Sequence, residues 1–457
     1  MEPETPPTVK RPFPVRGCLL VFGGLVVIMV LVLAVGGRLW CARSARLVQE
    51  EFARIREAGE PVTGDELNDF YALGENQTDC TQLWLRALRT FEGPAYYEAS
   101  EHIPIVGPND KEIPPLGEPW ADQAITEEFL KKYAGSMKLM HEAARQGGAA
   151  RYPIDLRDLY NASLPHVQQV RQGMRMLHLE AHVRARQGDP HAAAESIRTM
   201  IRLAESTERE PLLVSQLVRM ACHRIARDLT AELLPDVDFS DEDLARLQAD
   251  FAAIRYDDAM HRAMIGERVW GIQGFEDPAA VLGNDNPKFR LGPRNDDLLL
   301  YLDFMDEAVA VAKLSGPKRL AAALQCANRM QQFFDDANVV TKARHPHTTV
   351  FTPAIAAAFA AEARNEAQNR SVVALIAIER YRRKHDELPE NLEQLVPEFL
   401  DEVPVDPFDG QPLRYIIRDG KPILYSVGMD QFDDGGQGDS DGEPDILFPR
   451  PPYEEQP

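Results

Sequence analysis

The hydrophobic pattern of this chain begins with an unbroken apolar run over residues 17–36, GCLLVFGGLVVIMVLVLAVG. A helix of about 20 residues at 1.5 Å per residue spans the roughly 30 Å apolar core of a bilayer. Arg16 and Arg38 flank the run, and Trp40 is typical of a membrane interface. The following GRLWCARS is a poor cleavage site, so the pattern favours an uncleaved transmembrane helix, preceded by a tail over 1–16, over a signal peptide.

Apolar residues then recur at helical spacing as far as about residue 350. Glycines, prolines and capping residues divide the pattern into segments, and Thr63–Glu66 has the form of a capping box that opens a helix. The other expected helices cover 42–58, 77–91, 126–145, 164–187, 190–208, 212–234, 240–270, 295–313 and 318–335. Loops are expected over 102–120 and 283–293.

Two of these helices resemble a known repeat unit. Gln187-Gly188-Asp189-Pro190 is a tight turn between them, and LEAHVRARQGDPHAAAESIRTMIRLAE is similar to one tetratricopeptide-type hairpin. Stacked repeats need about three units to be stable, so one copy does not define an array. We therefore expect the region 42–350 to be a helical bundle or a short solenoid that packs its own core.

The pattern changes in the last quarter of the chain. An apolar stripe predicts a long helix over 354–384, and a short amphipathic helix follows around Leu392 and Leu395. Residues 413–418 and 422–427 then read as an antiparallel hairpin that reverses at Asp419-Gly420. These elements predict a small α+β module over 354–448 and a disordered tail over 449–457, so the fold class is mostly α.

The motifs of this module have a recognisable order. A helix ending in IERYRRKHDELP is followed by LEQLVPEFL, VPVDPFDGQPLRY, YSVGMD, a Gly-Gly pair and a closing Asp-Ile. The order resembles the globular domain of the major (G-type) pseudopilin of type II secretion systems, over residues 371–448. That resemblance implies a calcium-binding loop whose carboxylate ligands here are Asp430, Asp439, Asp441 and Asp445.

The chain also departs from that family. No pseudopilin processing site precedes the apolar run, and about 300 residues separate the run from the module, whereas the two are continuous in a pseudopilin. Asp433 and Asp434 replace residues of the family pattern inside the loop. We therefore expect an anchored helical protein that carries a pseudopilin-like module, and not a filament subunit.

General chemistry gives independent grounds for a cation. Seven acidic residues lie between Asp430 and Asp445, and they would repel one another in a folded loop without a counter-ion. Calcium binds six to eight oxygen ligands in flexible loops. We expect its role here to be structural, and the alternative is a solvated, partly disordered acidic segment.

Charge and cysteine usage narrow the function classes. The 50 basic and 72 acidic residues give a net charge of −22, which disfavours nucleic-acid binding. The five cysteines show no metal-ligand or redox spacing, so a disulfide framework is not expected. No phosphate-binding loop, dinucleotide fingerprint or nucleophile elbow occurs in the sequence, and no small-molecule substrate is evident.

One histidine pair could bind a metal. His178 and His182 are four residues apart, with Glu180 between them, so both can face one side of a helix and ligate zinc. The metalloprotease pattern requires Glu directly after the first histidine, but Leu179 stands there, and no third ligand is evident. The sequence therefore favours packing or surface roles for both histidines.

Three hypotheses follow. The first is a non-enzymatic, single-pass protein of a bacterial inner membrane, with an extracytoplasmic body that binds a protein partner and a calcium-stabilised C-terminal module. Basic residues after the apolar run favour a cytoplasmic body instead, so export depends on the calcium argument. The second is an accessory component of a type II secretion or pilus-like machine. The third is an enzyme whose site includes His178, Glu180 and His182.

Overall fold

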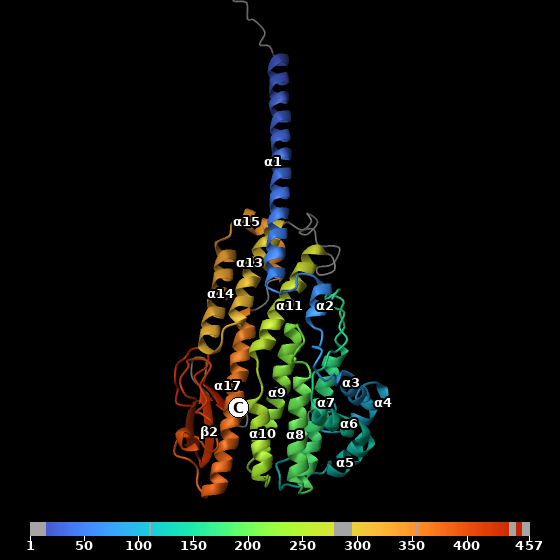
Figure 1. The fold of residues 1–457 in the computed structure, drawn as a ribbon, viewed down its shortest axis with the longest axis vertical. Coiled ribbons are helices and arrows are strands. Elements are labelled where there is room, and N and C mark those ends of the chain that lie inside the picture. The colour runs from blue at the N-terminus through green and yellow to red at the C-terminus, as the bar shows by residue number, and fades with distance from the viewer. Residues whose placement is uncertain (1–14, 109–110, 278–294, 352–354, 438–444, 450–457) are drawn as a thin grey trace, which may run out of the picture.

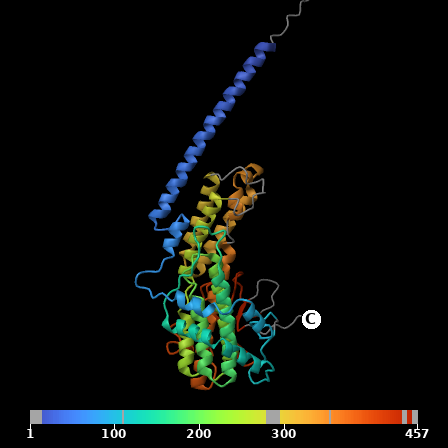
Figure 2. The ribbon, with the colours of Figure 1, turned by 90° about the vertical axis from the view of Figure 1, so that its right-hand side faces the viewer.

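Helix α1 (Val15–Glu57) contains the apolar run and continues without a break into the body of the protein (Figure 1). The computed structural model describes residues 15–108, 111–277, 295–351, 355–437 and 445–449. The sequence predicted two helices here, but Gly36 and Gly37 do not interrupt the single helix, because a glycine costs a helix only about 1 kcal/mol. The first half of α1 projects away from the body (Figure 2), with exposed apolar side chains such as Leu25 and Ile28. It is long and apolar enough to be a membrane anchor or a signal sequence.

A group of short helices follows on one flank of the body (Figure 1). They are α2 (Gly64–Phe70), α3 (Thr81–Leu88), α4 (Pro94–Ser100), α5 (Gln123–Lys132) and α6 (Ala134–Gln146). The predicted capping box opens α2, since Thr63 Oγ1 accepts from the backbone N–H of Glu66 at 3.2 Å. The single helix predicted over 126–145 is wrong: the chain breaks at Tyr133, whose ring packs 5.0 Å from that of Phe129 and 5.5 Å from that of Tyr96.

Five longer helices form the centre of the body. They are α7 (Pro165–Arg186), α8 (Pro190–Glu205), α9 (Leu213–Leu233), α10 (Asp241–Ala252) and α11 (Asp257–Glu276). The predicted α7–α8 turn is confirmed: Gly188 has φ +73°, and Asp189 caps α8 by accepting from the N–H of Ala192 at 3.0 Å. The helix predicted over 240–270 is instead α10 and α11, because Arg219 donates to the carbonyl of Arg255 at 2.7 Å and holds the chain out of helical geometry there.

The last helices connect the anchor region to the C-terminal sheet. They are α13 (Asn295–Ala312), α14 (Gly316–Asp336), α15 (Val339–Arg344), α16 (Pro346–Phe351) and α17 (Ile355–His385). Helix α17 packs against α9, α10 and α14 and also against strands β2 and β3, so the helical region and the sheet share one element. The loop predicted over 283–293 lies outside the described residues.

The C-terminal sheet confirms the predicted hairpin. Its elements are the 3₁₀ turn η2 (Leu392–Leu395) and strands β1 (Arg414–Arg418), β2 (Lys421–Ser426) and β3 (Ile446–Phe448). The strands are antiparallel in the order β1-β2-β3, with Ile416 opposite Ile423. Asp419 and Gly420 both have positive φ, 51° and 74°, as a two-residue hairpin turn of type I′ requires. The short strand β3 was not predicted.

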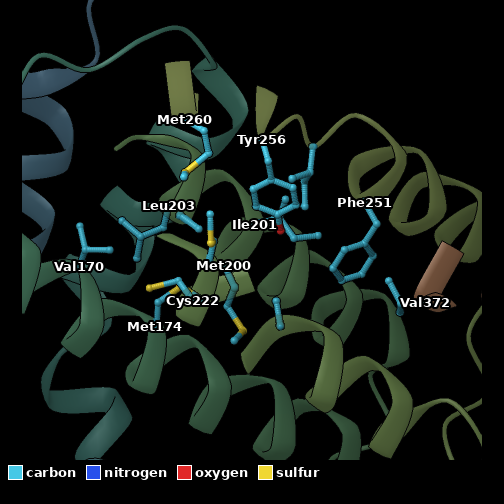
Figure 3. Packing of buried hydrophobic residues seen from close by; sticks show 14 of the residues in the cluster. Val170, Met174, Met200, Ile201, Leu203, Cys222, Phe251, Tyr256, Met260 and Val372 are labelled. Atoms are coloured by element: carbon cyan, nitrogen blue, oxygen red, sulfur yellow. The ribbon is translucent and has the colours of Figure 1, made fainter. Parts of the chain in front are cut away.

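The larger of two hydrophobic clusters runs through the body. In Figure 3, Met174 of α7, Met200 of α8 and Cys222 of α9 meet at its centre, next to Tyr256 and Met260 from the start of α11. The same core extends through α17 to buried side chains of the sheet. Because the two regions bury apolar surface against each other, we expect them to unfold together.

Candidate functional site

The predicted calcium ligands fall in different settings. Asp430 is exposed, and its Oδ1 accepts from the backbone N–H of Phe432 at 3.1 Å. Asp445 is buried, and its Oδ2 accepts from the N–H of Gly436 at 2.8 Å. Asp439 and Asp441 lie outside the described residues. Within the described part of the loop, Asp430 and Asp445 thus bind different backbone N–H groups and share no partner.

Asp445 has the chemistry of an incomplete site. Its Oδ1 is buried and has no hydrogen-bond partner among the described residues. Burial raises the pKa of this carboxyl, the Gly436 N–H opposes that shift, and the nearby charges of Asp433 and Asp434 add to it. A buried, unpaired carboxylate oxygen is costly, and a bound cation would stabilise it. The residues present therefore fit a cation at Asp445, although the structure gives no set of ligands for it.

Other acids of the module pair with Arg414, a residue that no sequence motif singled out. Arg414 Nη1 lies 3.0 Å from Asp406 Oδ2, its Nη2 contacts Asp409, and its Nε lies 3.4 Å from Asp433 Oδ2. Asp406 is fully buried and also accepts from Ser426 Oγ at 2.8 Å. The VPVDPFDG motif thus builds a turn around a charged hydrogen-bond network, and only part of the acidic excess needs a cation.

The histidine pair on α7 is brought together as the sequence predicted. His178 Nε2 lies 3.1 Å from His182 Nε2, and the two rings stack with their centroids 5.1 Å apart. A third group comes from α9: Glu232 Oε1 lies 3.7 Å from His182 Nε2. One ligand atom from each residue falls within 4.8 Å of the other two. Glu232 could not be recognised from the sequence, because it lies 50 residues after His182 and only the packing of α9 on α7 brings it close.

Burial keeps both imidazoles neutral. It lowers the pKa of His178 to about 4 and that of His182 to about 3, where the neighbouring His178 and Arg186 lower it further. Burial also raises the pKa of Glu232, while Arg186 opposes that change. Neutral imidazole is the form that ligates a metal, so both rings can bind one at neutral pH without losing a proton.

Glu180, the third residue of the enzyme hypothesis, does not join the histidine pair. Its Oε2 lies 2.7 Å from His141 Nε2 and accepts from Ser196 Oγ at 3.0 Å. Thr199 Oγ1 lies 2.8 Å from the other nitrogen of His141, which completes a hydroxyl–imidazole–carboxylate order. Thr199 is buried, and its hydroxyl donates to the Glu195 carbonyl at 2.8 Å. Because this hydroxyl is buried and its proton is used, the network is structural.

A surface pocket beside α8 lies close to several charged groups. It has a volume of about 350 Å³ and is lined by residues that include Arg202, Glu205, Arg209 and Asp250. Although burial acts to raise the pKa of Glu205, Arg219 and His223 outweigh it and lower the pKa to about 2. A carboxylate this acidic is a weak base. Arg202 is likewise paired, with Asp250 Oδ1 at 2.6 Å, so the pocket offers little reactive chemistry.

No family model, no curated protein and no solved structure matches this chain. The pseudopilin-like character of the C-terminal module accordingly stays a prediction from its motifs.

Proposed function

We propose that the protein is a non-enzymatic scaffold, anchored by α1 in a bacterial inner membrane, that holds its helical body outside the cytoplasm for a protein partner. The observation that carries this proposal is the continuity of α1 from the apolar run to Glu57. A helix without a break is a stiff connection, whereas a Gly- or Ser-rich linker would be flexible. The orientation of the membrane span therefore sets that of the body.

The contacts at the end of α1 support a rigid attachment. Ser44, Val48 and Ile55 are buried against the body. Arg54 pairs with Asp306 of α13, and Asn295 Nδ2 donates to Ser44 Oγ at 3.4 Å. Helix α1 is thus fixed to α13 along several turns, and we expect the body to begin close to the membrane surface.

We include a calcium ion in the proposal because calcium binding supports an extracytoplasmic location of the body. Extracytoplasmic modules bind calcium at roughly 0.1–1 mM. The buried, unpaired Oδ1 of Asp445 supports a cation at the C-terminal loop. Its role would be to neutralise carboxylates and to hold the loop beside β3, not to activate water.

Membrane extraction tests the anchor. The full chain should stay in the membrane fraction through high salt and carbonate and dissolve only in detergent. Intact-mass measurement should show an uncleaved N-terminus. A variant lacking residues 1–37 should be soluble and should keep the circular-dichroism signal of the helices that remain. Release by carbonate, or a chain cleaved after the apolar run, would contradict the anchor and indicate a signal sequence.

Site-specific photo-crosslinking tests the scaffold role. Val214 and Leu217 of α9 are 50% and 39% exposed and lie three residues apart, so they share one helix face. A cross-linker at either position should give an adduct of the same mass in membranes. The control position, exposed Lys138 on α6, should not. Adducts that are equally strong at all three positions, or missing at all three, would argue against a partner on this face.

A further inference from the structure

Two neighbouring helices place three metal-ligating side chains at one point. The spacing of His178 and His182 puts both rings on one face of α7. Helix α9 packs against α7, and its last turn carries Glu232. Two imidazoles and one carboxylate therefore converge from two helices that belong to the same buried core, so the rest of the body fixes their relative position.

The distances suit a small ion. In tetrahedral zinc coordination with bonds near 2.1 Å, neighbouring ligand atoms are about 3.4 Å apart. The two Nε2 atoms are 3.1 Å apart, and His182 Nε2 is 3.7 Å from Glu232 Oε1. The third separation, between the ligand atoms of His178 and Glu232, is within 4.8 Å, so the half-exposed Glu232 side chain has to move toward His178 to complete the site. Calcium, which prefers six to eight oxygens, fits this donor set poorly.

From these positions we propose that His178, His182 and Glu232 bind one divalent transition-metal ion, with zinc as the preferred ion. Imidazole nitrogen and carboxylate oxygen are both common zinc ligands, and three protein ligands leave a fourth position for water. The Glu232 side chain is 50% exposed, so an ion can enter from solvent at that side. The site is independent of the scaffold function and of the acidic C-terminal loop.

The surrounding charges allow the site. Arg186, one turn further along α7, is directed to the loop before α5: it donates to the carbonyls of Glu118 at 2.9 Å and Pro115 at 3.0 Å and stacks on Trp120. Arg184 lies 3.7 Å from Glu180. Arg184 is paired with a carboxylate. The carbonyls leave the charge of Arg186 uncompensated, and the negative charge of Glu232 offsets its repulsion of a bound ion.

Without a metal, one Nε2–H must point to the other Nε2, which makes a simple hydrogen bond between the rings. Metal binding requires the Nε2 lone pairs of both rings, with the protons on Nδ1. If the pair is only a hydrogen bond, the protein takes up no metal at this position. If it is a metal site, the protein binds one ion per chain, so a metal titration distinguishes the two.

The test uses the detergent-solubilised full chain, stripped with a chelator and titrated with Co²⁺ and then with Zn²⁺. We expect one equivalent of Co²⁺ with the visible absorption of a tetrahedral site, and its displacement by Zn²⁺. Glu232→Gln and His178→Gln should each weaken metal binding at least about tenfold. Even the loss of a residue that only orients a metal ligand typically lowers the affinity by that factor. Both residues are partly or largely exposed, and circular dichroism checks that each variant is folded.

Matched controls separate this site from unspecific uptake. Asp236→Asn removes an exposed acid three residues after α9, and His102→Gln removes an exposed histidine elsewhere. Asp445→Asn tests the C-terminal loop. All three should bind Co²⁺ as the wild type does. Failure of the wild type to bind one equivalent, or unchanged binding in folded Glu232→Gln and His178→Gln, would overturn the proposal and leave a histidine–histidine hydrogen bond only.

Discussion

Arg268 Nη2 lies 2.8 Å from Glu60 Oε2, and this ion pair joins α11 to the segment that directly follows the anchor helix. The same guanidinium reaches Asp306 of α13 at 2.9 Å and is 1% exposed. One buried arginine therefore ties together three elements at the base of α1. A cation in this position compensates two carboxylates that would otherwise repel each other.

Arg268→Met should destabilise the protein strongly. The substitution keeps most of the volume but removes the cation that Glu60 and Asp306 share. Lys313 still pairs with Glu60 and Arg54 with Asp306, so we expect a loss of about 3 kcal/mol, at the low end for breaking a buried pair. Thermal unfolding in detergent measures the loss. Arg246→Ala, which breaks an exposed pair with Glu242, is the control and should cost less than about 1 kcal/mol. Similar losses of stability in the two variants would show that the buried network stabilises the protein no more than an exposed ion pair does.

Glu267 should make stability depend on pH. Burial raises its pKa to about 7, against the opposing hydrogen bond from the Leu213 N–H. A raised pKa in the folded state means that the folded chain holds the proton more tightly than the unfolded chain, whose glutamates titrate near pH 4.3. The contribution of protonated Glu267 to the free energy of unfolding is fully present below about pH 4.3 and is lost as pH rises to about 7.

The test for Glu267 is Glu267→Gln, which cannot ionise. The stability difference between variant and wild type should move by on the order of 2–3 kcal/mol in favour of the variant between pH 4.5 and pH 8. Unfolding midpoints at several pH values measure it. Exposed Glu242→Gln should follow the wild type throughout. A difference that does not change with pH would contradict the buried, proton-binding role of Glu267.

Gly266 should not tolerate a side chain. A Cβ at this position of α11 would lie 1.6 Å from the carbonyl oxygen of Pro211, which is backbone and cannot move aside easily. We expect Gly266→Ala to cost about 3 kcal/mol. Gly135→Ala in α6 is the matched control, because nothing lies within 4 Å of its Cβ. Gly135→Ala should gain roughly 0.5–1 kcal/mol of stability from helix propensity. If it lost stability as Gly266→Ala does, the clash with Pro211 would not explain the effect at Gly266.

Asp445→Asn should abolish the response to calcium. At about 100 times its dissociation constant, an ion adds about 2.7 kcal/mol to stability. The wild type should therefore melt higher in calcium than in chelator, whereas Asp445→Asn should melt at one temperature in both. Because the neutral amide removes repulsion from Asp433 and Asp434, the variant in chelator should be at least as stable as the wild type. An equal wild-type response to magnesium, or none, would contradict a calcium site.

Locally encoded features could be predicted from the sequence. The Gln187–Pro190 turn and the Asp419-Gly420 hairpin follow from the conformations that glycine, proline and aspartate allow, and the structure has both. The helix breaks at Tyr133 and Arg255 could not be predicted, because an aromatic cluster and the distant Arg219 side chain impose them. Local patterns favour continuous helices at both places.

The candidate sites also combine features that are visible in the local sequence with features that only tertiary packing creates. The His178–His182 pair was visible as a four-residue spacing, but Glu232 becomes a partner only through tertiary packing. In the C-terminal module, the acidic loop was visible in the composition. The pairing of Arg414 with Asp406, Asp409 and Asp433 depends on how the hairpin and the loop fold together. The same folding leaves Oδ1 of Asp445 buried without a hydrogen-bond partner among the described residues.

Labelling from outside the cell shows on which side of the membrane the body lies, and Cys41 is a natural reporter for it. The Cys41 thiol is exposed, whereas those of Cys80, Cys222 and Cys326 are buried. A membrane-impermeant maleimide should label Cys41 in intact spheroplasts. Tyr97→Cys in a Cys41→Ser background, at a 57% exposed position on α4, should be labelled as well. Labelling of both sites only after the membrane is permeabilised would place the body in the cytoplasm and contradict the account.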